Sequence, residues 1–142
     1  MKRIAFLLLV LAAHSLGNEA AAQEFQVVVN AGNPVSSISR EDLSRIFLKK
    51  VGRWASGTSA VAVDLQADNA AREAFSQAIH GRGASAIASY WQQQIFAGRD
   101  VPPEEKGSAA AVLDFVTATP GAVGYVPAGT RVGNGVKVID LR

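Results

Sequence analysis

The chain has 142 residues, no cysteine, 49% hydrophobic residues and a formal net charge of +2. The absence of cysteine excludes disulfides, thiolate chemistry, cysteine-ligated metals and lipid attachment at a cysteine. The low net charge lacks the dense basic footprint of a nucleic-acid-binding protein, so we expect no nucleic acid partner. A chain of this length can bury about two-thirds of its unfolded surface, which is enough for one core.

Residues 1–22 have the pattern of a cleavable secretory signal peptide. Lys2 and Arg3 provide the positive start, residues 4–13 are apolar, and residues 20–22 are small alanines before Gln23. The apolar run is too short for a bilayer, which requires about 20 residues. We therefore expect a periplasmic or secreted domain over residues 23–142, with no membrane insertion after cleavage. Its formal charge is +1, because cleavage removes two basic residues and one acidic residue.

Strands and helices alternate along this domain. A β-branched run predicts a first strand over residues 24–30, and the stripe of Leu43, Ile46 and Phe47 predicts a short helix that opens at Ser39. A loop follows over residues 49–58, and alternating valines predict a strand over residues 59–65. Asp68 or Asn69 can cap the next helix, which ends at Gly81.

The C-terminal half continues the alternation. Ile87, Trp91 and Ile95 recur every four residues and predict a helix over residues 85–97 that stops at Gly98. An irregular charged loop begins at residue 102, Ser108 can cap a fourth helix, and strands are predicted over residues 122–126 and 136–141. The alternation indicates an α/β fold with a mixed or parallel sheet. Such folds bind ligands at the carboxyl ends of strands, here residues 30–36, 65–69 and 127–129.

Four segments together resemble the periplasmic phosphate-binding proteins of ABC transporters. They are the helix ISREDLSRIFL over residues 38–48, Trp54 followed by Gly57, the strand over residues 60–65 that leads to Phe75, and PGAVGYV over residues 120–126. The last segment is the most specific, and the resemblance covers nearly all of residues 24–142. It implies a single lobe of the periplasmic-binding-protein-like fold, with a mixed sheet flanked by about four helices. Members of that family have two lobes and are roughly twice as long.

The sequence differs from the family at the segment with which the family binds phosphate. There the family has an arginine followed by Ser-Gly-Thr at a helix start, whereas this chain has Asp64 and, further on, Asp68. Carboxylates at a helix start compete with an anion for the free N–H groups. The tripeptide Ser56-Gly57-Thr58 precedes a strand, so we interpret it as an ordinary turn. We therefore expect no tight phosphate binding.

Two groups of candidate residues remain. Polar residues near the expected strand ends form the tentative ligand-binding set, namely Asn30, Gly32, Ser36, Gln66, Asn69 and Arg72. For Arg72 the alternative is an ion pair with Asp68 across one helical turn. Basic and aromatic residues of one loop form the tentative interaction surface, namely Lys49, Lys50, Arg53 and Trp54. Trp54 is either an aromatic anchor for a partner protein or a core residue.

The sequence offers no recognisable catalytic site. His80 is the only histidine after residue 22, and at a helix end it is expected to be a cation that complements the dipole. We identify no catalytic residue, metal ligand or cofactor, and we expect no enzyme activity. The leading hypothesis is an exported, non-catalytic solute-binding-like domain with weak binding of a small anion. The alternative is a periplasmic protein-interaction module with no small-molecule ligand.

Overall fold

A six-stranded mixed sheet forms the centre of the computed structural model, which describes residues 24–142. Its strands are β1 (Phe25–Asn30), β2 (Ser37–Ile38), β3 (Val61–Leu65), β4 (Glu104–Lys106), β5 (Ala122–Pro127) and β6 (Val136–Leu141). Their order across the sheet is β2-β6-β1-β5-β3-β4. Strand β1 is antiparallel to β5 and β6, whereas β3 is parallel to both β5 and β4. The expected signal peptide lies outside the described residues.

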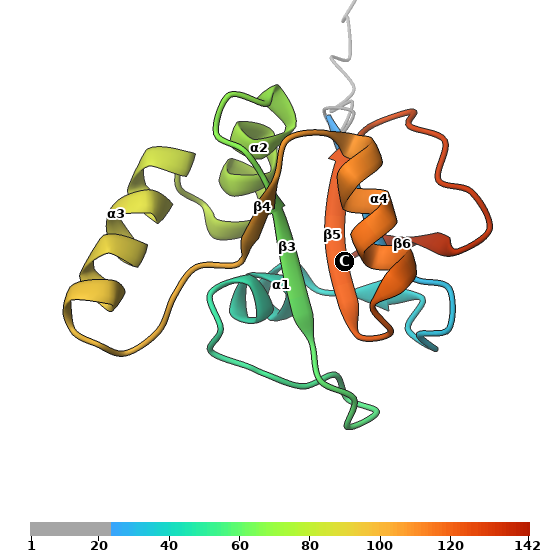
Figure 1. Ribbon diagram of the computed structural model, residues 1–142, viewed down its shortest axis with the longest axis horizontal. Coiled ribbons are helices and arrows are strands. Elements are labelled where there is room, and N and C mark those ends of the chain that lie inside the picture. The colour runs from blue at the N-terminus through green and yellow to red at the C-terminus, as the bar shows by residue number, and fades with distance from the viewer. Residues whose placement is uncertain (1–23) are drawn as a thin grey trace, which may run out of the picture.

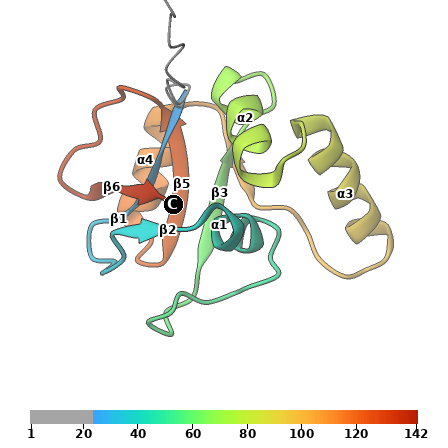
Figure 2. The same ribbon diagram turned by 180° about the vertical axis from the view of Figure 1, so that it is seen from behind.

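Helices cover both faces of the sheet (Figures 1 and 2). Helix α4 (Ala109–Ala118) packs on one face, while α1 (Arg40–Phe47) and α2 (Ala70–Phe75) pack on the other. Helix α2 continues directly into a π-helical turn, η1 (Ser76–His80), and α3 (Ala84–Phe96) stands beside the β4 edge. The expected α/β fold, a mixed sheet flanked by four α-helices, is confirmed. None of the helices in residues 24–142 combines the length and apolarity that a bilayer-spanning helix requires.

Aromatic side chains fill the core between the sheet and the α1–α2 layer. Phe75 stacks on Tyr125 with ring centroids 3.9 Å apart, and Phe25 and Phe47 pack around this pair. On the opposite face, Gly124 allows α4 to approach, because a Cβ at this position would lie 2.8 Å from Val63 and 2.9 Å from Val112. The alternation of Gly124 and Tyr125 along β5 therefore gives each face of the sheet its own packing.

The predicted helix ends are mostly confirmed. Ser39 accepts a hydrogen bond from the Asp42 backbone N–H at 3.1 Å, and Ser108 accepts one from that of Ala111 at 3.2 Å. Gly81 adopts a φ of 68° after η1, where a residue without a side chain is favoured. Of the two possible caps for α2, Asn69 is the one used, and it accepts a bond from the Ala71 N–H.

Two short strands and one helix face differ from the prediction. The segment that begins at residue 102 is not wholly irregular, because β4 pairs with β3 despite its charged sequence. The pair Ser37–Ile38 forms β2, which is too short to give a periodic signal. Ile95 is 51% exposed, so the apolar stripe of α3 stops at Ile87 and Trp91. Neighbouring strands and the position of α3 decide these features, and neither is encoded locally.

Candidate functional site

The sheet topology separates the six residues of the predicted ligand set. Asn30 ends β1 and Gly32 and Ser36 follow it, while Gln66, Asn69 and Arg72 follow β3. Because β1 is antiparallel to β5 and β3 is parallel to it, the carboxyl ends of β1 and β3 lie at opposite ends of the sheet (Figure 1). The expectation of a shared strand-end site assumed that these strands were parallel. The structure does not bring the six residues into one site.

Asn30 has a structural role at its end of the sheet. Its side-chain nitrogen donates to the backbone oxygens of Val116 and Thr117, at 2.9 and 3.0 Å, in the last turn of α4. Its side-chain oxygen accepts from the Gly32 N–H at 2.9 Å. Both polar atoms of the Asn30 side chain are therefore already engaged in closing the β1 turn against α4.

Arg72 lies at the opposite end, in what we call the sheet-end cluster, formed by Asp64, Arg72, Glu105 and Tyr125. Arg72 is only 7% exposed, and its Nη1 donates to the backbone oxygen of Leu65 at 2.5 Å. Its Nε lies 3.4 Å from Asp64 Oδ1, and its Nη1 lies 3.6 Å from Glu105 Oε2. The Tyr125 hydroxyl donates to Asp64 Oδ1. Arg72 thus pairs with Asp64 and Glu105, and the predicted pair with Asp68 is not formed.

Electrostatics make the sheet-end cluster unfavourable for an anion. Burial raises the pKa of Asp64, while the Arg72 guanidinium and the Tyr125 hydroxyl act in the opposite direction. Burial, followed by the charge of Asp64, raises the pKa of Tyr125, so its hydroxyl remains a donor. With two carboxylates and one guanidinium ionised, the cluster has a formal charge of −1. The cavity of about 190 Å³ between this cluster and α3 is therefore acidic at its base.

The predicted interaction loop is only partly on the surface. Lys49, Lys50 and Arg53 are exposed, and Lys49 lies 3.6 Å from Asp100. Trp54 is 7% exposed and donates from Nε1 to the backbone oxygen of Gly121 at 2.9 Å. Of the two alternatives for Trp54, the structure places it in the core, which corrects the expectation of an exposed anchor. An indole fills the end of the core here, and its N–H finds a buried acceptor.

The predicted turn over residues 56–58 also has the expected geometry. Gly57 has a φ of 91°, which favours glycine, and its N–H donates to the Trp54 oxygen at 2.8 Å. Strand β3 begins at Val61, so no helix start stands behind this tripeptide. The tripeptide therefore shapes the loop around Trp54.

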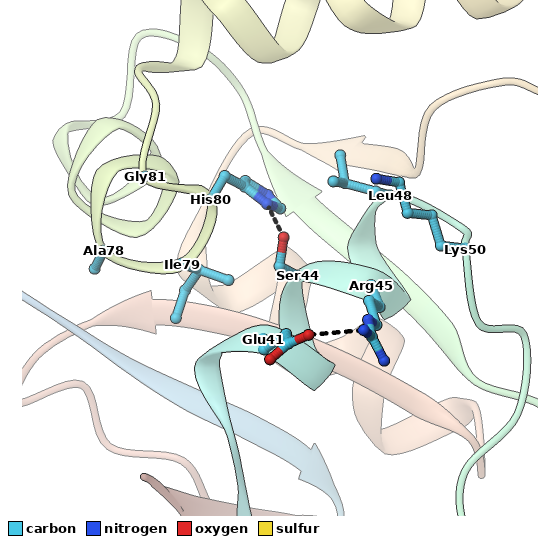
Figure 3. Close-up of a pocket in the computed structure, with 9 residues that line it drawn as sticks. All are labelled: Glu41, Ser44, Arg45, Leu48, Lys50, Ala78, Ile79, His80 and Gly81. Atoms are coloured by element: carbon cyan, nitrogen blue, oxygen red, sulfur yellow. Dashed lines mark hydrogen bonds and ion pairs between the residues drawn. The ribbon is translucent and has the colours of Figure 1, made fainter.

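A second site lies between α1 and η1, in a groove that sequence analysis did not identify (Figure 3). We call it the α1–η1 groove, and its volume is about 590 Å³. Polar, charged and apolar residues share its lining, namely Glu41, Ser44, Arg45, Leu48, Lys50, Ala78, Ile79, His80 and Gly81. Ser44 and His80 point toward each other, with Ser44 Oγ 2.7 Å from His80 Nδ1. These two residues are 36 positions apart, so no local motif links them.

His80 is neutral in this groove. Burial is the largest cause, and the positive charges of Arg82 and Arg72 add to it, so that its pKa falls to about 4. The expectation of a cationic histidine at the helix end is therefore wrong, because desolvation and nearby arginines outweigh the helix dipole. The π-helical turn carries this histidine, and such turns are frequent at functional sites.

The Ser44–His80 pair does not have the arrangement of a catalytic triad. In the described residues, the His80 ring has no carboxylate partner that would orient it, and Ser44 stands on a regular helix. No three histidine, aspartate or glutamate side chains within residues 24–142 are grouped to hold a metal ion. The arrangement offers hydrogen bonds and positive charge, which suit binding.

Comparison with solved structures shows a fold similar to that of proteins named for phosphate transport. The chain is similar to an ABC-type phosphate transport receptor from Vibrio cholerae, with a TM-score of 0.64, 21% identity and coverage of 83% of this chain and 46% of that one. For a phosphate ABC transporter substrate-binding protein from Clostridium perfringens, solved with bound phosphate, the TM-score is 0.63 and the identity 19%. The match covers 83% of this chain and 44% of that one. For PstS from Borrelia burgdorferi, the TM-score is 0.59 and the identity 13%, and the match covers 84% of this chain and 47% of that one.

These similarities establish the fold, and the resemblance noted in the sequence is confirmed at that level. The chain spans less than half the length of each of these proteins. The Vibrio cholerae and Clostridium perfringens proteins are named as a receptor and a substrate-binding protein, and not as enzymes. No protein-family model matches the sequence, and a search of curated proteins gives no match either.

Proposed function

We propose that the chain is an exported, non-catalytic domain that uses a solute-binding fold and binds a small anion weakly. The observation that carries the weakness of this binding is the state of Arg72, whose guanidinium already lies beside two carboxylates and a backbone oxygen. The fold neighbours named as phosphate receptors support an anionic solute. Because the charge of Arg72 is already neutralised within the fold, we do not expect this anion to bind tightly.

The weakness follows from what an anion would have to displace. A phosphate that reaches Arg72 must separate it from Asp64, which is itself 6% exposed and would remain buried without its cationic partner. Leaving a buried charge unpaired costs several kcal/mol, about 3–5 in typical proteins. The gain from two or three new hydrogen bonds to phosphate would be largely offset. Tight binding therefore requires a site other than Arg72.

Calorimetry of the mature domain with phosphate, sulfate and small organic acids tests this proposal. We expect dissociation constants in the millimolar range for at least one of these anions. A phosphate dissociation constant at or below about 1 μM, equivalent to about −8 kcal/mol, would overturn the claim of weak binding. The absence of binding by every anion would overturn the anion-binding function itself.

Export is the part of the proposal that depends on residues 1–22. The sequence of these residues and the fold neighbours named as transport receptors support a periplasmic location. Mass spectrometry of the protein from the producing cell should show a mature N-terminus at Gln23 or within a few residues of it. Recovery of the full-length chain in the membrane pellet would contradict export and cleavage.

One observation favours the second candidate function, a periplasmic protein-interaction module. The end of α3 and the loop after it expose three apolar side chains, Ile95 at 51%, Phe96 at 92% and Val101 at 58%. Exposed large apolar side chains are typical of protein contacts where they form a contiguous patch. A periplasmic protein retained by the wild type and lost with Phe96→Ser, at unchanged melting temperature, would support this function. Equal retention by both would contradict it.

A further inference from the structure

We propose that the α1–η1 groove is the binding site for a small organic anion that carries one or more carboxylates. This inference rests on the proposed function and gives it a place and a ligand class. It concerns a different region from the sheet-end cluster, which contains Arg72 of the predicted ligand set. Three properties of the groove support it: its charge, its hydrogen-bonding groups and its apolar walls.

Charge is the first property. Arg45 and Lys50 contribute two positive charges to the lining and Glu41 one negative charge, so the lining has a formal charge of +1. Arg40 adds a further cation at the groove, since its Nη1 lies 3.4 Å from the backbone oxygen of Ala78. Arg82 acts on His80 from the turn after η1. An anion is therefore attracted here and repelled at the sheet-end cluster.

The hydrogen-bonding groups are the second property. The Arg45 side chain makes one hydrogen bond within the described residues, from Nη2 to Glu41 at 2.7 Å, and it is 51% exposed. A guanidinium that uses one nitrogen can still donate from the others to a carboxylate. The Ser44 hydroxyl on α1 and the neutral His80 ring on η1 point toward each other and join the two walls of the groove (Figure 3). They can donate to or accept from a ligand without adding charge.

The apolar walls are the third property, and they favour an organic anion over an inorganic one. Leu48 comes from the end of α1, and Ala78 and Ile79 come from η1, so both walls carry apolar side chains beside the charged groups. Leu48 and Ile79 are 7% and 6% exposed, so the carbon surface that they offer is small. Phosphate or sulfate would leave this surface unused, whereas the carbon chain of a small organic acid would cover it. A volume of about 590 Å³ also exceeds what one inorganic anion fills.

The test compares anion binding by matched variants. Succinate and citrate are the probes, and phosphate is the inorganic comparison, all titrated by calorimetry into the mature domain. Arg45→Ala and Lys50→Ala each remove one exposed cation from the groove and should weaken citrate binding about tenfold, since charge-assisted hydrogen bonds are lost. The control variant Arg131→Ala removes an exposed cation in the loop between β5 and β6 and should change the citrate dissociation constant less than about twofold.

Proton NMR of the His80 ring gives a second readout that does not depend on affinity. His80 is the only histidine in residues 24–142, so its ring signals are unambiguous and should shift on addition of citrate. Citrate binding that neither groove variant weakens, with an unmoved His80 signal, would overturn the groove as the site and leave the proposed function standing. If the wild type binds no anion, the proposed function fails and the groove proposal fails with it. Stronger binding of phosphate than of citrate would overturn the organic ligand class.

Discussion

The sheet-end cluster and the α1–η1 groove each place an arginine beside a carboxylate, yet the two arginines differ in accessibility. The Arg72 side chain is 8% exposed and touches Asp64, Glu105 and the Leu65 backbone. The Arg45 side chain is 51% exposed and has one bond to Glu41. Burial forces Arg72 to satisfy its donors within the fold, whereas water can satisfy those of Arg45 until a ligand arrives.

The comparison shows why a buried arginine at a strand end is a poor indicator of a ligand site. In the sheet-end cluster, the guanidinium joins α2 to β3 and to the edge strand β4. The arrangement fixes the position of three elements and leaves a net negative charge. In the groove, Arg45 on α1 and Lys50 in the loop after it are both exposed, so we expect their removal to leave the core intact. The following predictions test this division between a structural arginine and an available one.

The largest expected effect is on stability, from Arg72→Ala. The substitution leaves Asp64 buried without its cation and removes the donor to the Leu65 oxygen, so we expect a loss of about 3–5 kcal/mol in the free energy of unfolding. Urea denaturation of the mature domain measures it. The matched control, Arg45→Ala, should cost less than about 1 kcal/mol because its ion pair is exposed. Similar losses in the two variants would contradict the division.

A double substitution tests whether the buried charge itself causes the loss. Asp64→Asn combined with Arg72→Met removes both charges and keeps the side-chain volumes close to those of the wild type. We expect this variant to recover a large part of the stability that Arg72→Ala loses, since replacing a buried ion pair is often close to neutral. A double variant as unstable as Arg72→Ala would show that the specific hydrogen bonds, and not the unpaired charge, hold the cluster together.

The next effect is the pH dependence of stability that His80 confers. Its pKa is lowered in the folded state from 6.5 to about 4, so on acidification the unfolded chain takes up the proton first. The free energy of unfolding therefore falls as the pH drops from 7 toward 4. Because His80 is partly exposed, we expect the free energy of unfolding to fall by about 1–2 kcal/mol over this range, which is less than the full pKa shift would give. The measurement is urea denaturation at several pH values.

His80→Gln is the control for this pH effect. The variant retains a hydrogen-bonding side chain opposite Ser44 but cannot titrate, so the difference between its stability and that of the wild type should vary across this pH range. Asp64 acts in the opposite direction, starting above its ordinary pKa of 3.8, because its pKa is raised and the folded state takes up that proton first. Asp64 is present in both proteins and cancels in the difference. A difference that is constant from pH 7 to pH 4 would show that His80 is not the titrating group.

Periodic and capping signals made much of the fold predictable. The stripe of Leu43, Ile46 and Phe47 is buried as expected, and the caps Ser39 and Ser108 make the bonds that their side chains favour. These features depend on residues within one or two turns of each other, and so a sequence displays them directly. The last strand, residues 136–141, also has the predicted bounds.

The site was predictable only in part, because its geometry depends on topology. The sequence indicates an ion pair between Arg72 and Asp68, one helical turn apart, and this partner is wrong. Arg72 pairs instead with Asp64, which precedes it by a strand end and a turn. The direction of β1 decided that Asn30 and Asn69 lie at opposite ends of the sheet. Ser44 and His80 meet only because η1 packs on α1. No periodicity encodes such contacts.

The smallest expected effect on stability comes from Glu41→Gln in the groove. Glu41 is 74% exposed at its side chain and contacts Arg45 across one turn of α1, so its neutralisation should change the free energy of unfolding by less than about 0.5 kcal/mol. It should nevertheless raise the formal charge of the groove lining from +1 to +2 and free the Arg45 donor. We therefore expect citrate to bind a few-fold more tightly at low salt, with the gain lost as salt screens it.

Asp64→Asn is the matched change at the other arginine, and we expect it to lower stability without creating citrate binding there, since Arg72 stays buried. If Glu41→Gln leaves citrate affinity unchanged at low salt, Arg45 does not contact the anion, and the groove loses the feature that distinguishes it from the sheet-end cluster.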